Sequence, residues 1–222
     1  MRAREFVYAI LWKLGVRARS ASSVQRDIFT DAYNSNLWAG AESRSGTGST
    51  RERGSHFRAE LLQVLERFQI RSIVDAPCGD FNWMQDVVTD QDYVGIDIVE
   101  TLISANRERH PTRRFQCGDL TRDPLPKADV ILSRDCLVHF SYADIRAAID
   151  NFRRSGSKYL LTTTFPSAAN VDIRTGGWRA LHLRAEPFSF PEPLAVIAEF
   201  PAGVVNAHPD KQLALWDFAS LP

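Results

Sequence analysis

A chain of 222 residues, 44% of them hydrophobic and 24% charged, has the length and composition of one folded domain. This balance excludes collagen-like and wholly disordered proteins. The 27 basic residues equal the 27 acidic ones, so we expect no nucleic-acid partner. Cys78, Cys117 and Cys136 are far apart and have no histidine at metal-ligand spacing, which predicts a reduced, cytoplasmic protein without a metal site.

The N-terminal residues 6–12 form an apolar run with basic residues on both sides. Lys13 interrupts this run well before the roughly 20 residues that cross a bilayer, and no signal-peptide cleavage pattern follows. Two interpretations remain open: a short helix packed on the domain, or a helix in weak contact with a membrane surface. We expect residues 1–54 to be a lead-in that caps the ligand site, with a polar, loop-rich part at 20–54, and residues 55–222 to be the main domain.

From residue 56 onward, segments typical of helices and strands alternate. Apolar residues recur every three or four positions at 56–68, which is the period of an amphipathic helix. Further helices are expected at 83–88, 100–109 and 141–154, the last capped by Ser141. Strands are expected at 70–76, 93–98, 114–117, 128–133, 158–165, 194–200 and 213–218. The pattern predicts an α/β fold whose central sheet of about seven strands is mostly parallel, ends in an antiparallel hairpin and has helices on both faces.

Four acidic residues stand at or just past the ends of successive predicted strands: Asp75, Asp97, Asp119 and Asp135. In an open parallel sheet, the carboxyl ends of the strands meet at one edge, where ligands bind. Each acid taken alone is equally explained as a residue that ends a strand or caps a helix. Four acids at the same place on four successive strands predict a binding site.

The turn after the first strand, residues 76–80, narrows the choice of ligand. It has one glycine, Gly79, and the carboxylate of Asp80 stands where a dinucleotide site would place its pyrophosphate. This arrangement argues against cofactors that bind through phosphate groups. A ligand with a ribose, an adenine edge and positive groups fits better, since Asp97 can accept from the ribose hydroxyls and Asp119 from the adenine amine. S-adenosylmethionine (SAM) is such a ligand.

Residues 73–80, 95–98, 117–120 and 131–135 resemble the ordered motifs of class I, Rossmann-like SAM-dependent methyltransferases. The lead-in, with Trp38 and the Ser-Gly-Thr-Gly-Ser segment at 45–49, also resembles a bacterial subgroup that methylates sugars in surface or signalling glycans. The first motif differs from the family pattern, because Pro77 and Asp80 replace glycines.

The resemblance implies a role for each matching position. Asp97 and Ile98 would hold the ribose, Asp119 and Leu120 the adenine, and the turn of Asp75, Ala76, Pro77 and Gly79 would face the methionine part. The backbone of Ser133 and Arg134 would receive its ammonium group, and Trp38, Gly46 and Ser49 would close over the cofactor. Trp38 is equally explained as a residue that packs on the helix at 56–68.

Asp135 and His139 are the candidate catalytic residues, because they follow the fourth strand end. A hydroxyl acceptor needs a base, and histidine has a pKa suited to that role near pH 7. Asp135 would then orient the imidazole. His139 lies between Val138 and Phe140, so a packing role explains it equally well. We expect Cys78 and Cys136 to be buried small residues rather than nucleophiles.

The polar segment 170–186 carries side chains suited to a sugar acceptor, namely Arg174, Trp178, Arg179, His182 and Arg184. A solvated loop with one anchored aromatic residue is the alternative. The sequence thus predicts a SAM-dependent methyltransferase that acts on a hydroxyl of a carbohydrate or glycan precursor. N- or O-methylation of a small metabolite, or a non-catalytic binding subunit with this fold, remain as alternatives.

Overall fold

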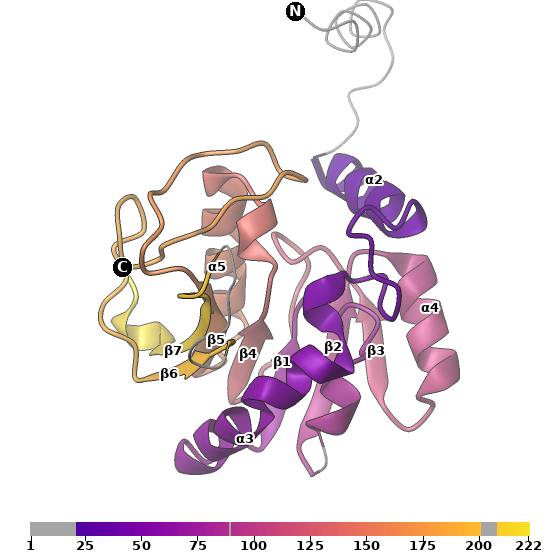
Figure 1. Cartoon of the computed structure of the whole chain (residues 1–222), viewed down its shortest axis with the longest axis horizontal. Coiled ribbons are helices and arrows are strands. Elements are labelled where there is room, and N and C mark those ends of the chain that lie inside the picture. Colours follow the sequence, from indigo (N-terminus) through magenta and orange to yellow (C-terminus); the bar gives the residue numbers. More distant parts are fainter. Residues whose placement is uncertain (1–20, 89, 201–207) are drawn as a thin grey trace, which may run out of the picture.

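The computed structural model describes residues 21–88, 90–200 and 208–222, so the apolar run at 6–12 lies outside the described residues (Figure 1). Seven strands form one sheet in the order β3-β2-β1-β4-β5-β7-β6. They are β1 (Ser72–Asp75), β2 (Asp92–Asp97), β3 (Arg114–Cys117), β4 (Val130–Ser133), β5 (Tyr159–Thr164), β6 (Ala195–Ala198) and β7 (Gln212–Asp217). All seven lie where the sequence predicts strands.

The sheet is parallel from β3 to β5, and β7 runs antiparallel to both β5 and β6. This arrangement confirms the predicted α/β fold with a final antiparallel pair. The chain builds β2 and β3 on one side of β1 and then returns to place β4 on the other side. The reversal leaves a crevice at the carboxyl ends of β1, β2 and β4, which is where open α/β sheets bind ligands.

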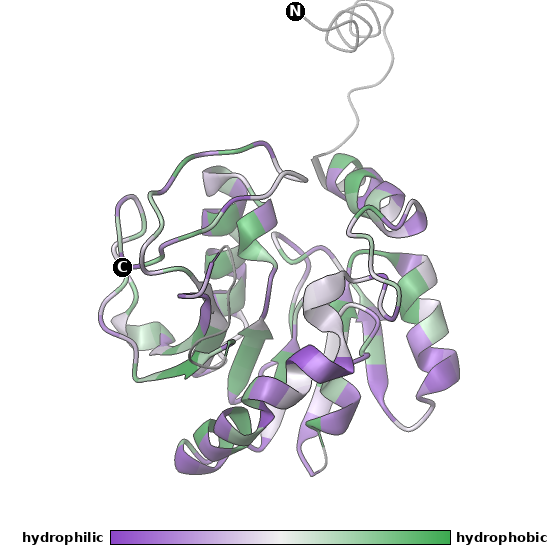
Figure 2. Ribbon diagram, viewed as in Figure 1, coloured by the Kyte–Doolittle hydropathy of each residue, from purple (hydrophilic) through white to green (hydrophobic). Residues whose placement is uncertain are grey.

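Helices cover both faces of the sheet. Successive strand residues point to opposite faces, so each strand contributes side chains to two separate cores. Val74, Ile131 and Leu160 pack in the core under α5 (Tyr142–Arg154), whereas Ile73 and Leu132 belong to the core under α3 (Arg51–Arg67) and α4 (Glu100–Arg109). Figure 2 shows β4 mainly in green, while α3 and α4 carry both purple and green residues. The helices at 100–109 and 141–154 are confirmed, and the hydroxyl of Ser141 caps α5 by accepting from the Asp144 N–H.

Residues 20–54 differ from the predicted loop, because α2 (Ala21–Asn34) is a 14-residue helix. Its inward residues recur at three- and four-residue spacing. They are the buried Gln25 and Ala32 and the half-buried Ile28, Phe29 and Tyr33.

Helix α3 begins at Arg51, where Thr50 accepts from the Arg53 N–H, so the helix predicted at 56–68 starts earlier and the proposed division at 54/55 falls inside it. The helix expected at 83–88 is a single 3₁₀ turn, Met84–Asp86. Within the described ranges, none of the helices is long and apolar enough to cross a membrane.

Candidate active site

A cavity of about 440 Å³ opens at the carboxyl ends of β1, β2 and β4. This volume falls in the range of small-molecule sites. Most of the predicted site residues line it: Trp38, Gly46, Ser49, Asp75, Pro77, Gly79, Asp97, Ile98, Asp119, Leu120, Arg134, Asp135 and His139. Ala76 and Ser133 do not line it, because both are fully buried in the sheet, where the Ser133 carbonyl accepts from the Thr162 hydroxyl and the Ala76 N–H donates to the Leu132 carbonyl.

The turn after β1 brings the lead-in segment against the cavity floor. Gly79 has a φ of 53°, and a Cβ there would lie 2.5 Å from Ser45 Oγ, so only glycine fits this close approach. Asp80, at a position where the motif that the sequence resembles has a glycine, accepts from the hydroxyl of Ser43 and the N–H of Arg44, and its own N–H donates to Ser45 Oγ. This carboxylate therefore has a structural function, since it holds residues 43–45 against the turn.

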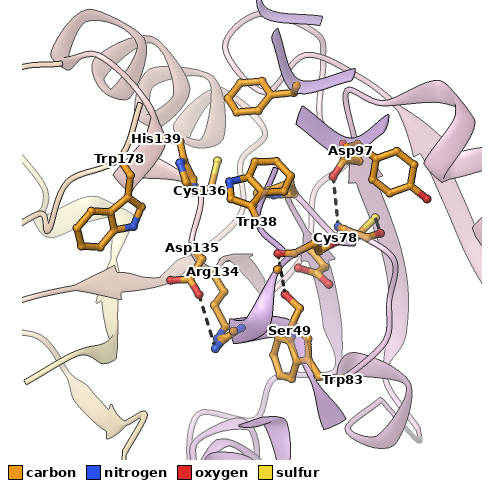
Figure 3. Close-up of a pocket in the computed structure, with 18 of the residues that line it drawn as sticks. Trp38, Ser49, Cys78, Trp83, Asp97, Arg134, Asp135, Cys136, His139 and Trp178 are labelled. Atoms are coloured by element: carbon orange, nitrogen blue, oxygen red, sulfur yellow. Dashed lines mark hydrogen bonds and ion pairs between the residues drawn. The ribbon is translucent and has the colours of Figure 1, made fainter. Parts of the chain in front are cut away.

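Asp97, at the end of β2, keeps acceptor capacity toward the cavity. Oδ2 accepts from the N–H of Gly79, at 3.2 Å (Figure 3), and Oδ1 accepts from the N–H of Val99, at 3.0 Å. Each carboxylate oxygen has a second lone pair, so the group can accept two further hydrogen bonds. Burial raises the pKa of Asp97 to about 6.

Asp75, at the end of β1, is buried behind the cavity floor. The Tyr93 hydroxyl donates to its Oδ2 at 2.7 Å. Burial is the main reason that the pKa of Asp75 rises to about 7, and the hydrogen bond from Tyr93 opposes that rise.

Asp119 lies after β3 with its carboxylate fully buried. Oδ1 accepts from both the N–H and the hydroxyl of Thr121, whereas Oδ2 lies 3.2 Å from Arg122 Nε and has no hydrogen-bond partner. Buried polar atoms normally take part in a hydrogen bond, so Oδ2 of the cavity-lining Asp119, which has only the ion pair with Arg122, can still accept one from a ligand.

A quartet of charges stands beside the end of β4, formed by the buried Arg134 and Glu199 and the partly exposed Asp135 and Lys211. Arg134 donates two hydrogen bonds to Glu199, at 2.9 and 2.6 Å, and Lys211 Nζ lies 2.6 Å from Asp135 and 3.0 Å from Glu199. The Arg134 guanidinium also lies 5.1 Å from the ring centroids of both Phe57 and Trp83. Sequence reasoning missed Glu199 and Lys211, because no local motif marks them.

The contacts within the quartet argue against the role expected for Asp135, which was to orient the imidazole of His139. Lys211 and Arg134 hold the pKa of Asp135 well below its usual range against the opposing effect of burial, so it is a weak base. Its carboxylate bonds to Lys211 and, at 3.4 Å, to the Thr163 hydroxyl, and the expected bond from Asp135 to the His139 ring is not among its contacts with the described residues. Asp135 also has a φ of 54°, a conformation that is uncommon for residues other than glycine.

His139 lies at the cavity wall in a 3₁₀ turn, Leu137–His139. Its Nδ1 lies 2.7 Å from the Gly177 carbonyl oxygen, and its ring lies 5.7 Å from the ring of Trp38 (Figure 3). Burial lowers the pKa of His139 below its ordinary value. The imidazole is therefore neutral at pH 7.

Of the five acceptor candidates in 170–186, only Trp178 lines the cavity. Its ring is half exposed and contacts the rings of His208, at 5.1 Å, and Phe165, at 6.2 Å. Arg179 is buried away from the cavity, Arg184 pairs with Glu192, and the backbone of His182 bonds to Asn170. Phe165 and His208, which complete this aromatic wall, are not marked by any sequence motif.

The cysteines are not poised as nucleophiles. Burial raises the pKa of the Cys78 and Cys136 thiols well above the ordinary value, and that of Cys117 to about 11. All three thiols are protonated near neutral pH, as expected for small packing residues.

Residues 73–157 match the family model of a methyltransferase domain, a segment that runs from β1 through α5 and includes the floor of the cavity. The fold is similar to that of an S-adenosylmethionine-dependent methyltransferase from Clostridium acetobutylicum ATCC 824, with a TM-score of 0.54 and 10% identity over 72% of this chain and 90% of that one. It is also similar to magnesium protoporphyrin IX methyltransferase from Synechocystis PCC 6803, solved with bound SAM, with a TM-score of 0.51 and 14% identity over 71% and 82% of the two chains.

An amino pentose methyltransferase from Micromonospora echinaspora, involved in calicheamicin biosynthesis, matches at 18% identity and a TM-score of 0.43 over 47% of this chain. The present chain spans 48% of that enzyme. A comparison with curated proteins finds no match.

The sheet order and the place of the cavity agree with the Rossmann-like fold of these methyltransferase structures. The segment that matches the methyltransferase-domain model makes up less than half of the chain.

Proposed function

We propose that this protein transfers a methyl group from SAM to a hydroxyl group of a carbohydrate. The observation that carries the proposal is a neutral histidine, His139, in the same cavity as the acids expected to hold the cofactor. SAM, when bound, supplies an electrophilic methyl group.

The residues around the cavity fit this cofactor. Among the described residues that line it, five are Asp or Glu and three are Arg or Lys, and this excess of acidic residues favours a ligand with a positive sulfonium and ammonium group. Asp97 has lone pairs left for the two ribose hydroxyls, and Oδ2 of Asp119, which accepts no hydrogen bond from the described residues, suits the adenine amine. The missing side chain of Gly79 leaves room for the methionine part beside Asp75.

The proton of the acceptor hydroxyl would go to His139. A carbonyl oxygen only accepts, so the Nδ1 that faces the Gly177 carbonyl carries the proton of the neutral ring. Nε2 then has a free lone pair, which is what a general base needs. Asp135 is bound to Lys211 and keeps its charge, so it is placed to stabilise the imidazolium that forms rather than to take the proton itself.

The wall formed by Phe165, Trp178 and His208 supports a carbohydrate as the acceptor. A half-exposed indole offers an apolar face on which the C–H groups of a sugar ring can lie, and the His208 ring beside it has polar nitrogens. This wall, Lys211 and His139 all line the same cavity.

We expect SAM binding to depend on the ionised form of Asp97. Asp97→Asn should weaken binding roughly 10- to 100-fold, because the ribose hydroxyls lose a charged acceptor. In the wild-type protein the affinity for SAM should fall as the pH drops through about 6, the raised pKa of Asp97, because a protonated carboxyl group accepts hydrogen bonds less well. Calorimetry between pH 5 and pH 8 measures both effects.

The matched control is Asp92→Asn, an exposed carboxylate at the opposite end of β2 that should leave the affinity and its pH dependence unchanged. An Asp97→Asn protein that binds SAM like the wild type would remove Asp97 from the site.

The acceptor is tested by SAM turnover against nucleotide sugars, oligosaccharides and amines. With a carbohydrate acceptor, Trp178→Ala should raise KM for the sugar by roughly 3- to 10-fold, the value of one aromatic contact, and leave the affinity for SAM unchanged. Trp178→Phe, which keeps an aromatic face, should lie close to the wild type. Turnover of amines alone would replace the carbohydrate with an amine substrate, and SAM binding without any turnover would favour a binding subunit.

A further inference from the structure

Residues 172–179, here called the strap, lie along the 3₁₀ turn of His139 and the start of α5. The Asp172 carboxylate accepts from the Tyr142 N–H at 2.8 Å, and the Thr175 hydroxyl accepts from the Ser141 N–H at 2.9 Å. The Gly176 N–H donates to the His139 carbonyl at 2.9 Å. Hydrogen bonds therefore join the strap to this stretch along most of its length.

The strap ends in Arg179, whose buried guanidinium holds both ends of the turn. Nη1 donates to the Leu137 carbonyl and Nη2 to the Phe140 carbonyl, each at 2.9 Å, and the backbone N–H donates to the Val138 carbonyl at 3.1 Å. These carbonyls flank His139 in the sequence. A planar guanidinium that donates two hydrogen bonds fixes the spacing and direction of its acceptors more closely than a single donor can.

Gly177, two residues before Arg179, presents its carbonyl to the His139 ring at 2.7 Å. This bond selects the tautomer with the proton on Nδ1 and leaves Nε2 unprotonated. In many active sites a side-chain carboxylate orients the histidine in this way. Here a backbone carbonyl does so, and its position depends on how the strap is held.

We propose that Arg179 is a positioning residue, which holds the strap and the 137–140 turn together so that the Gly177 carbonyl fixes the orientation and tautomer of His139. The proposal rests on the proposed function of His139 as the base. The proposal assigns Arg179 to the 137–140 turn. The sequence predicts instead that this arginine binds the acceptor.

The charged groups around the ring agree with this arrangement. Asp135, at the end of β4, raises the pKa of His139, whereas Arg179 on the strap and Lys211 before β7 lower it, and burial lowers it most. Arg179 thus also contributes to keeping the imidazole neutral.

The test is nitrogen NMR of the His139 ring in the full-length protein, without and with SAM, with the signal assigned from its absence in His139→Ala. The wild-type ring should be in the Nδ1-protonated form. In Arg179→Ala, the ratio of this form to the Nε2-protonated form should fall about 5- to 10-fold, the value of one weakened neutral hydrogen bond. Arg179→Lys, which retains the charge but can no longer donate as a planar fork, should fall in between.

Arg184→Ala is the matched control, because Arg184 lies in the same region but is exposed and pairs with Glu192. It should leave the tautomer ratio unchanged. An unchanged ratio in folded Arg179→Ala, or in Arg179→Lys if the alanine variant does not fold, would overturn the role of Arg179. A wild-type ring protonated on Nε2 would overturn it as well, whereas a protein that fails to bind SAM at all would overturn the proposed function instead.

Discussion

Replacing His139 with alanine should lower kcat with a hydroxyl acceptor by roughly 10²- to 10⁴-fold, the usual contribution of a positioned general base. The affinity for SAM should change little, because Asp97 and Asp119 stand at the ends of other strands. The wild-type rate should fall on the acid side as the pH drops through the imidazole pKa, which burial places below the ordinary value for histidine. Steady-state kinetics from pH 5 to pH 9 measure both results.

A matched variant separates the chemistry from the packing. His139→Asn keeps an amide donor for the Gly177 carbonyl but has no basic nitrogen, so it should be as slow as His139→Ala. Wild-type turnover in either variant would rule out His139 as the base. Asp135 is a poor replacement because Lys211 holds it ionised with a low pKa, so a nitrogen nucleophile that needs no base would then be favoured.

The fold was predictable because its signals are local. Short apolar runs followed by acids predict parallel strands whose ends meet, and the seven strands lie where these runs occur. Helix α2 was missed because its apolar residues stand among many polar ones and share the inward face with the buried Gln25. In the same way, Thr50 caps α3 several residues before the first apolar residue of the periodic pattern, Phe57.

The site was predictable only at its strand ends. Asp97 and Asp119 lie directly after apolar runs, and they line the cavity. Lys211 is 76 residues from its partner Asp135, and Glu199 is 65 residues from Arg134, so no spacing in the sequence indicates either pair. The partner of His139 is a backbone carbonyl, which carries no side-chain signal.

The largest effect on stability is expected from the buried ion pair of the quartet, Arg134 and Glu199. Arg134→Met should lower the free energy of unfolding by about 3–5 kcal/mol, because breaking a buried ion pair leaves an uncompensated charge inside the protein. Glu199 would retain only Lys211, at 3.0 Å, which it shares with Asp135. Urea unfolding of the SAM-free protein at pH 7 measures the change.

Two further variants decide whether the paired charge is the cause. Arg51→Met, which breaks the exposed pair with Asp86, should cost less than about 1 kcal/mol. The double variant Arg134→Met/Glu199→Met should be more stable than Arg134→Met alone, because it removes the charge that the single change leaves unpaired. If Arg134→Met cost no more than Arg51→Met, the quartet would not be holding the end of β4 to β6 and β7. If the double variant were less stable than the single one, the loss of the contacts of the Arg134 guanidinium with the Phe57 and Trp83 rings would account for the destabilisation instead.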